Sequence, residues 1–583
     1  MGQGTRTGPR DAYRFARGER IDLPPYRDGK AQNSAQLRRP LDFAVVTDHS
    51  DLLGETQICQ RPDLSGYGSL ICTMVRRWPL LGYMLVNGYT YGTTAPHRYS
   101  FCGEAGRNCL DAAREPWAQI QRAAEEFYDR SPRCSFTTFV GYEWTGMPDG
   151  NNIHRNVIFR NEVVQAAPTT YIETPTAEGL WDALLAECID REGRCDAIAI
   201  PHNSNVSNGL LFQTKRADGT PISKDDALRR ARIETLVEIT QHEGDSECRI
   251  NANDELCAFE TVPWVRMMDA PRPSLWKPAP PLSFVRETLA AGLTQQQRIG
   301  ANPFKLGIIG STDTHFSTAG MVDEDTFVGH GAGTVFAAHG IPPFPDNPRF
   351  NPGGLAVLWA EENSRDALFA AMRRREAYGT SGPRIVVRFF GGWDYPTTMC
   401  DSQSFAQIGY RQGVAMGSDL SPRTAAAPLF AVSAARDPGT NGSPSTPLQR
   451  IQIVKLWTED GTERQHVFDV AGSANTQADV DLSTCEPRGP GADSLCTVWR
   501  DPSFDPNTAA AYYARVVENP SCRWNTYACN RHRVDCSDSS TFPGSLRQCC
   551  DPAIPKTIQE RAWTSPIWYS PQPPSSTGPS AAR

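Results

Sequence analysis

Acidic and imidazole side chains follow several short apolar runs of this chain. The run at residues 306–309 passes through a Gly-Ser break to Asp313 and His315, which are two residues apart. Side chains two apart on a strand point to the same face. A carboxylate and an imidazole on one face, at the carboxyl end of a buried strand, suit a divalent metal ion in an α/β barrel. This stretch therefore predicts a pair of metal ligands.

Three further apolar runs end in residues of the same kinds. His49, Glu143 and His202 each stand at the end of such a run, and His154 begins another extended segment. Taken singly, each has an ordinary explanation, such as a helix cap, a turn or an ion pair with an arginine. Randomly placed solvated histidines would not gather at strand ends, so the joint pattern favours a metal site. The predicted metal ligands are His49, Glu143, His154, His202, Asp313 and His315.

Two polar residues beside these ligands are candidates for substrate binding. Arg155 follows His154, and Asn203 follows His202. A guanidinium group binds phosphate or sulfate through paired hydrogen bonds, so a small anionic substrate is expected. The predicted catalytic residues are Glu143, Asp313, Arg155 and Asn203.

An acidic cluster accompanies a further predicted strand at residues 233–241. One interpretation is a set of groups that shapes the entrance or orients the metal ligands. The other is a solvated loop. No Gly-x-Ser-x-Gly sequence and no nucleotide-binding motif offers a competing chemistry. The cluster consists of Glu238, His242, Glu243, Asp245 and Glu247.

The ligand-bearing segments resemble, in order, motifs of the polymerase and histidinol phosphatase (PHP) superfamily. The resemblance implies a distorted (β/α)7 barrel with two or three divalent metal ions (Zn, Mn or Fe). It also implies hydrolysis of a phosphoester or related ester by a metal-activated water. In this scheme Glu143 bridges two ions, His154 and His202 serve one of them, and His49 and His315 serve another. Asp313 reaches an ion that in the superfamily also takes a His-x-His pair. The segments are Thr47-Asp48-His49, Gly141-Tyr142-Glu143, His154, Pro201-His202-Asn203 and Ser311-Thr312-Asp313-Thr314-His315.

Longer blocks resemble one bacterial branch, the domain-of-unknown-function family numbered 3604. This resemblance covers nearly the whole chain, but it brings no settled activity with it. The blocks are Gly141-Tyr142-Glu143-Trp144-Thr145, Gly244-Asp245-Ser246-Glu247-Cys248, Tyr378-Gly379-Thr380-Ser381-Gly382-Pro383-Arg384 and Trp563-Thr564-Ser565-Pro566-Ile567-Trp568-Tyr569.

The chain departs from the superfamily at its start. Members open with a strand that ends in His-x-His, and this chain has no such motif. Residues 9–16 resemble the helix that follows that strand, so we expect an N-terminally truncated sequence whose complete form is an enzyme. The alternative is a catalytically impaired barrel, a pseudo-enzyme that acts as a binding or structural protein.

Composition restricts the partners and the compartment. The net charge of −8 gives the chain no positive field that would attract nucleic acid, so we expect no nucleic-acid partner. No apolar run is long enough for a transmembrane helix. The oligomeric state is left open. Seventeen cysteines, many in near pairs, favour short-loop disulfides in an oxidising compartment, and their odd number leaves at least one thiol free or intermolecular. We expect a periplasmic or secreted protein whose signal peptide was lost by truncation. The near pairs are Cys59 and Cys72, Cys102 and Cys109, Cys188 and Cys195, Cys248 and Cys257, and Cys485 and Cys496.

Alternating helix and strand patterns predict the α/β class, with a distorted (β/α)7 PHP-type barrel that carries large insertions. After residue 383 the pattern changes to strands separated by turns, which is typical of a β-sandwich. The predicted organisation is a metal-binding barrel at 1–383, a β-rich sandwich-like domain at 384–520, a Cys-rich tail that packs on the barrel at 521–570, and a disordered end at 571–583.

Overall fold

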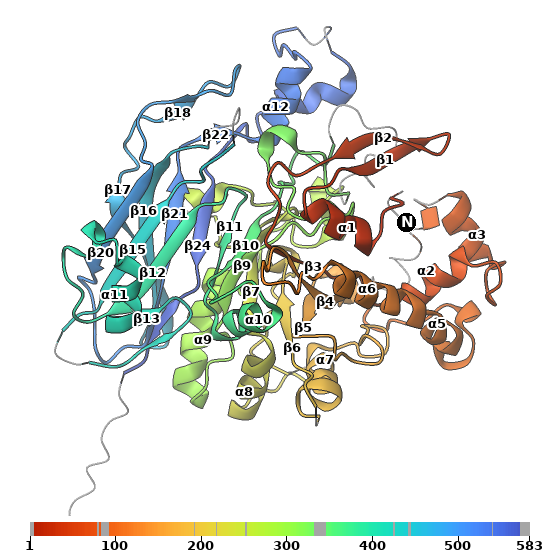
Figure 1. The fold of residues 1–583 in the computed structure, drawn as a ribbon, viewed down its shortest axis with the longest axis horizontal. Helices are drawn as coiled ribbons and strands as arrows, with labels where there is room; N and C mark the ends of the chain where they lie inside the picture. The colour runs from red at the N-terminus through yellow and green to blue at the C-terminus, as the bar shows by residue number, and fades with distance from the viewer. Residues whose placement is uncertain are drawn as a thin grey trace, which may run out of the picture.

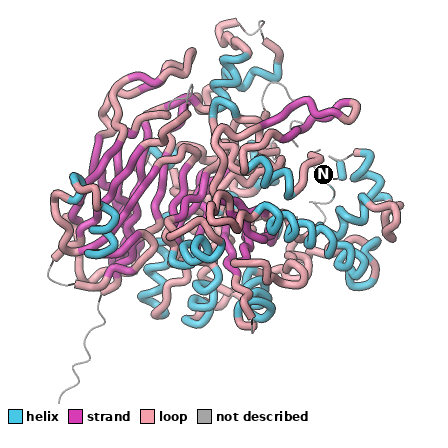
Figure 2. Tube along the Cα trace, in the orientation of Figure 1, coloured by secondary structure: helices cyan, strands magenta, loops and turns pink. Residues whose placement is uncertain are grey.

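The computed structural model describes residues 5–571, apart from residues 79–80, 83–84, 86–92, 192, 217, 251–252, 332–344, 424–425, 441–444, 539 and 541. The chain is a mixed α/β protein with several sheets (Figure 1). The strands of the second half gather on one side, and most helices lie on the other (Figure 2). The predicted disordered end lies outside the described residues beyond residue 571.

The site-bearing half contains a sheet of four strands in the order β3–β4–β5–β6. Strand β3 (Phe43–Val46) runs parallel to β4 (Thr137–Trp144), whereas β5 (Arg155–Phe159) is antiparallel to both β4 and β6 (Ala197–Pro201). A second sheet joins β7 (Leu236–Gln241) in parallel to β9 (Gly307–Gly310), with β8 (Gly244–Asp245) at its edge. These strands are short and almost wholly buried, as their apolar runs predict.

The predicted closed barrel is not formed by the strand pairs of the described part of the chain. Its strands belong to separate sheets, and no ladder joins β6 to β7. The all-parallel order is interrupted at β5, which follows β4 after only ten residues. Parallel neighbours need a longer crossover, so the chain returns antiparallel instead. The coarser expectation of an α/β chain is confirmed, and the barrel itself is not.

Helices alternate with the strands of this half, as the sequence pattern predicts. Helix α6 (Arg114–Phe127) buries Trp117 and Ile120 beside α1 (Pro9–Ala16). Ser364 caps helix α10 (Arg365–Arg374) by accepting a hydrogen bond from the backbone N–H of Ala367 at 3.3 Å. Further helices are α7 (Ala177–Leu184), α8 (Lys224–Ile233), α9 (Val285–Ile299) and α10 (Arg365–Arg374), and the insertion after β3 holds α2 (Leu53–Gln60), α3 (Leu70–Arg77) and α5 (Arg107–Ala112).

The largest sheet connects the two halves of the protein. Its main path is β10–β11–β24–β21–β16–β17. Strand β24 (Arg561–Thr564), from the end of the chain, lies between β11 (Ala377–Thr380) and β21 (Ala510–Glu518). The sheet therefore runs across the predicted boundary at residue 383. Its other strands are β10 (Leu355–Leu358), β16 (Leu448–Glu459), β17 (Thr462–Gly472), β14 (Asp419–Leu420) and β25 (Ile567–Tyr569).

A second antiparallel sheet packs face to face on the largest one. It has the order β13–β12–β15–β20 and shares an apolar core with β16 and β21. The rings of Phe430 and Tyr512 meet in this core at a centroid distance of 4.3 Å. Strands follow residue 384, as expected, and they lie together in Figure 1. The second sheet consists of β12 (Val386–Gly392), β13 (Gly413–Ala415), β15 (Leu429–Ala435) and β20 (Ser494–Arg500).

Eight disulfides join sixteen of the cysteines, and Cys134 is free. Four of the five near pairs are confirmed, but pairing of Cys485 with Cys496 is wrong. Cys496 lies on β20 and bonds to Cys400, whereas Cys485 bonds to Cys522. The ten residues between them include β19 (Pro487–Arg488), which pairs with β18 (Asp479–Val480) rather than with β20, so the two cysteines have different neighbours.

The tail packs through helix α12 (Trp524–Arg531) against the segment around residue 327. The rings of Trp524 and Phe327 lie 5.1 Å apart, and Arg523 donates hydrogen bonds to the backbone carbonyls of Pro348 and Phe350. Two disulfides, Cys529–Cys549 and Cys536–Cys550, close the tail on itself. No helix in the described part of the chain is long and apolar enough to cross a membrane.

Candidate metal centre

Glu143 lies at the middle of a group of imidazoles. Its Oε1 atom is 2.7 Å from His154 Nδ1 and 3.4 Å from His202 Nε2. Its Oε2 atom is 3.4 Å from His49 Nδ1, which also lies 2.7 Å from the hydroxyl of Thr145. One ligand atom each from Glu143, His154 and His202 lie within 4.8 Å of one another, a spacing that can hold a metal ion.

The register of the sheet explains why these residues meet. Glu143 pairs across β4 and β5 with Asn156, which places His154 beside the same end of the sheet. His202 follows Pro201, the last residue of β6, and Pro201 pairs with Arg155 on β5. His49 forms an isolated parallel bridge with Glu143 beyond β3. Three neighbouring strands thus deliver their side chains to one edge.

Strands β7 and β9 contribute the remaining residues of the site: Glu238 lies on β7, and Asp313 and His315 follow β9. His202 Nδ1 lies 3.6 Å from Glu238 Oε1 and 3.9 Å from Asp313 Oδ2. The rings of His315 and His49 have a centroid distance of 5.6 Å. Asp313 and Asn203 both adopt left-handed backbone conformations, with φ of 48° and 62°. A non-glycine residue held there costs about 1–3 kcal/mol, and such positions concentrate at functional sites.

Many polar atoms of this group are buried and lack a well-formed hydrogen bond within the described residues. An unpaired buried polar group costs about 1–3 kcal/mol, so a cluster of them needs a partner from outside the chain. Carboxylate oxygens and neutral imidazole nitrogens are the donors that Zn, Mn or Fe take in proteins. The residues therefore fit a divalent metal centre. The atoms are Glu143 Oε1, His154 Nε2, both ring nitrogens of His202 and of His242, Glu238 Oε1 and His315 Nδ1.

The charges of the site also favour cation binding. Burial lowers the pKa of His154 to about 4 and that of His315 to about 3, so both imidazoles are neutral at pH 7. Burial opposes ionisation of Glu143, but His49 and His154 hold its pKa well below the usual range. Burial, together with repulsion from Glu143 and other carboxylates, raises the pKa of Asp313 well above the usual range. A bound cation would relieve this repulsion between carboxylates.

Solvent reaches the centre from the side of His49. Its side chain is 40% exposed and that of Asp313 is 18% exposed, whereas His154, His202 and Glu143 are buried. A substrate would therefore approach past His49 and Asp313. All six predicted ligands lie in this one neighbourhood.

The two predicted substrate-binding residues lie elsewhere or are already engaged. Arg155 is buried, and its guanidinium donates to Glu234 at 3.0 Å and to the backbone carbonyls of Ile153 and Leu211. It therefore stabilises the interior behind the sheet rather than facing Glu143. Asn203 donates a hydrogen bond to Glu243 and stays beside the site, with its own side-chain oxygen unpaired.

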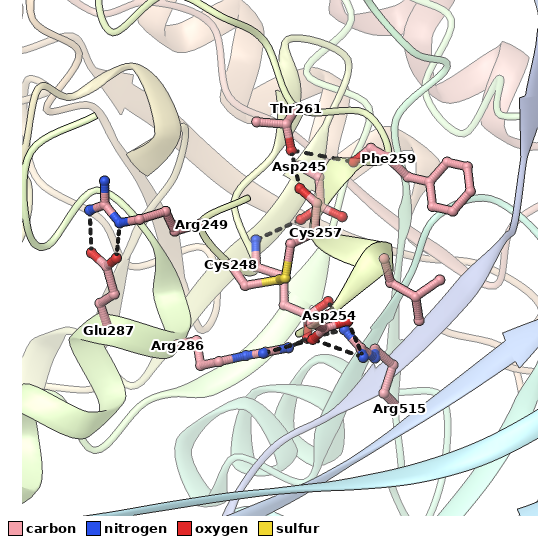
Figure 3. Close-up of a disulfide and its surroundings, with 12 residues drawn as sticks. Asp245, Cys248, Arg249, Asp254, Cys257, Phe259, Thr261, Arg286, Glu287 and Arg515 are labelled. Carbon is pink, nitrogen blue, oxygen red and sulfur yellow. Dashed lines mark hydrogen bonds and ion pairs between the residues drawn. A yellow bond between two sulfur atoms is a disulfide. The ribbon is translucent and has the colours of Figure 1, made fainter. Parts of the chain in front are cut away.

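The acidic cluster after β7 is buried, so its interpretation as a solvated loop is wrong. Glu238 accepts a hydrogen bond from Ser311 and faces His202. Glu247 binds Arg515 and Arg286, and Asp254 binds the same two arginines beside the Cys248–Cys257 disulfide (Figure 3). The cluster thus has two parts. Glu238 faces the candidate centre, whereas Glu247 forms ion pairs with Arg515 on β21.

One residue of the centre was not among the predicted ligands. His242 follows β7, is fully buried, and has its Nε2 atom 4.0 Å from Asp313 Oδ2. The pattern that identified the other ligands, an imidazole directly after a buried strand, also applies to Thr240-Gln241-His242.

A family model described as "Protein of unknown function (DUF3604)" matches residues 1–571. It confirms the resemblance seen in the longer sequence blocks and covers both halves of the protein. No curated protein and no solved structure is similar enough to match the chain.

Proposed function

We propose that this chain, which belongs to the DUF3604 family, is a divalent-metal-dependent hydrolase acting on a phosphoester or a related ester. The observation that carries the proposal is the buried group of carboxylate and imidazole donor atoms around Glu143, several of which lack a well-formed hydrogen bond within the described residues. Such a group has no stabilising role in a metal-free interior, because each unpaired atom costs free energy. It is explained if the atoms hold cations.

We assign the scaffold to the PHP type, on the resemblance of the strand-end motifs. Ligands delivered by the ends of β3, β4, β6 and β9 support this assignment, because barrel enzymes place their sites at the carboxyl ends of strands. The antiparallel β5 is then the distortion of the barrel.

The position of each residue suggests its role in binding metal or in positioning a ligand. Glu143, His154 and His202 would hold one ion, since their donor atoms already converge. Two bound ions would activate a water and stabilise the entering and leaving oxygens of the substrate. His49 and Asp313 border the exposed side, so as metal ligands they would hold a cation where an ester can approach from solvent. Asn203 would keep Glu243 in place beside the ligands.

A non-catalytic metal-binding protein is the second candidate. The engagement of Arg155 with Glu234 favours it, because the expected anion-binding guanidinium is not directed at the centre. Binding without turnover would give metal content and metal-dependent stability, but no product.

The test combines metal analysis with hydrolysis assays. The purified protein is analysed for bound metal and assayed with 4-nitrophenyl phosphate, bis(4-nitrophenyl) phosphate and 4-nitrophenyl sulfate before and after chelation. Metal content with chelator-sensitive hydrolysis, restored by Zn, Mn or Fe and absent in Glu143→Gln, supports the hydrolase. Metal content without turnover of any ester supports the binding protein. Protein that takes up no metal refutes both.

We also propose that the protein resides in an oxidising compartment, the periplasm or the cell exterior. The eight disulfides support this, because such bonds persist where glutathione and thioredoxin do not reduce them. Thiol labelling in intact cells, before and after reductant, tests it.

A further inference from the structure

His242 is the best-buried imidazole of the centre, and its ring makes no hydrogen bond within the described residues. It is 0% exposed, and neither of its ring nitrogens has a partner within the described residues. Its ring lies 5.8 Å from that of His315, 5.5 Å from that of His330 and 5.6 Å from that of Phe350, measured between centroids. Its Nε2 atom lies 4.0 Å from the carboxylate oxygen Oδ2 of Asp313.

The neighbouring His330 shows what a structural histidine looks like in the same surroundings. Its Nε2 atom lies 2.7 Å from the carbonyl of Pro352, and its Nδ1 atom lies 3.4 Å from the hydroxyl of Thr318. Its backbone N–H also donates to Asp346. Both nitrogens are therefore satisfied, as in most buried polar groups. His242 is buried to the same degree without any of these contacts.

The backbone holds His242 in place against Asp313. The N–H of Asn351 donates to the carbonyl of His242 at 2.9 Å. Gly353 packs beside this turn with φ of 87°, and a side chain there would come within 2.7 Å of the carbonyl of Ser311 and 3.3 Å of the backbone nitrogen of His242. A larger residue would not fit, so glycine allows the backbone at His242 to lie close to the segment that follows β9.

We propose that His242 is a ligand of a second divalent ion, which it shares with Asp313 and His315. The inference rests on the proposed metal-dependent function and extends it to a residue that the superfamily resemblance does not supply. Asp313 Oδ2 lies 3.9 Å from His202 Nδ1 and 4.0 Å from His242 Nε2, so it stands between the two groups of imidazoles. Donors on one ion can be separated by up to about 4.2 Å, twice a bond of about 2.1 Å.

A bound ion accounts for the two ring nitrogens of His242 that lack hydrogen bonds, whereas core packing does not. Phe350 and His330 surround His242 with aromatic rings, and a phenylalanine would fill that space without unpaired nitrogens. An imidazole whose Nε2 atom lies 4.0 Å from a carboxylate oxygen, with the ring of His315 5.8 Å away between centroids, supplies the donor types that Zn, Mn or Fe take. The second ion would lie on the His242 side of Asp313, and the Glu143 group would hold the first.

The test is a Co²⁺ titration of chelator-treated protein, followed by absorption spectroscopy and by the shift in Tm. We compare wild type with His242→Gln, with His154→Gln in the first group, and with His330→Gln as the matched control. We expect two equivalents for wild type and His330→Gln. His242→Gln should retain one equivalent and bind the second more than about 100-fold more weakly. His154→Gln should weaken the other equivalent.

A folding control keeps the result interpretable. His242→Phe, without metal, should be no less stable than wild type, because it removes two unpaired nitrogens while keeping an aromatic ring. Unchanged Co²⁺ binding in His242→Gln, or loss of both equivalents, would overturn the role of His242. If His154→Gln loses binding and His242→Gln does not, the proposed function stands and this inference fails. A wild type that binds no Co²⁺ overturns both.

Discussion

Replacing Glu143 by Gln tests the centre at the residue that contacts most of it. The change keeps the size of the side chain and removes its charge. Its two oxygens face His154, His202 and His49 at 2.7 Å, 3.4 Å and 3.4 Å, so no other ligand is as central. Structural zinc sites bind with about 10–16 kcal/mol. Shared over four ligands, one ligand contributes about 3 kcal/mol, which is roughly 100-fold in Kd.

The assay is metal content and affinity, measured by atomic spectroscopy after dialysis and by titration with Co²⁺ or Zn²⁺. Glu143→Gln should bind metal at least about 100-fold more weakly, and hydrolysis should fall in parallel. Metal-free stability should change by less than about 1 kcal/mol, because a charge that repels Asp313 and Glu243 is lost together with its attraction to imidazoles. His49→Ala is the comparison, and its effect should be milder because His49 is partly exposed and contacts Glu143 from one side.

Glu143 would not be the central metal ligand if Glu143→Gln kept wild-type metal content and affinity while His49→Ala lost both. Glu143 would then be an ordinary buried acid, and His49 would belong to a different site. A large loss of metal-free stability in Glu143→Gln would also contradict the assignment, since it would show that Glu143 serves the fold.

Three further predictions concern the rest of the molecule. Arg515→Met should destabilise the protein by about 3–5 kcal/mol in denaturant unfolding, because it leaves Glu247 and Asp254 buried with one partner fewer; a loss below about 1 kcal/mol would show that Arg286 suffices. Burial raises the pKa of Glu560 to about 7, so the folded state binds its proton more tightly than the unfolded state does. The proton on Glu560 contributes at most about 3 kcal/mol to the free energy of unfolding; this contribution is complete below about pH 4.5 and is lost as pH rises through 7. The free energy of unfolding of Glu560→Gln should not show this decline with pH. Wild type and variant with the same pH dependence of stability would contradict the prediction. Thiol titration in denaturant should give one free thiol, Cys134, without reductant and seventeen with it, and a higher unreduced count would disprove the disulfide set.

The sequence alone determined which polar side chains stand at the ends of buried strands. Short apolar runs specify buried strands, and a polar residue directly after such a run must emerge at the strand end. That local rule was sufficient for His49, Glu143, His202 and Asp313, and it applies equally to His242. The four short-loop disulfides were also predictable, because few residues separate their cysteines and the closed loops are small.

Tertiary structure decided what those local patterns leave open. The direction of β5 depends on a connection of ten residues, which allows only an antiparallel return, and this breaks the predicted barrel order. The partners of Cys485 and Cys496 depend on which strands become neighbours, so sequence distance could not identify them. The identity of a residue likewise does not reveal its partner. Arg155 follows a ligand in the sequence, but successive side chains on a strand point to opposite faces, and Arg155 meets Glu234 in the interior. A sequence states which side chains reach the end of a strand, whereas only the packed sheets establish which of them face the same space.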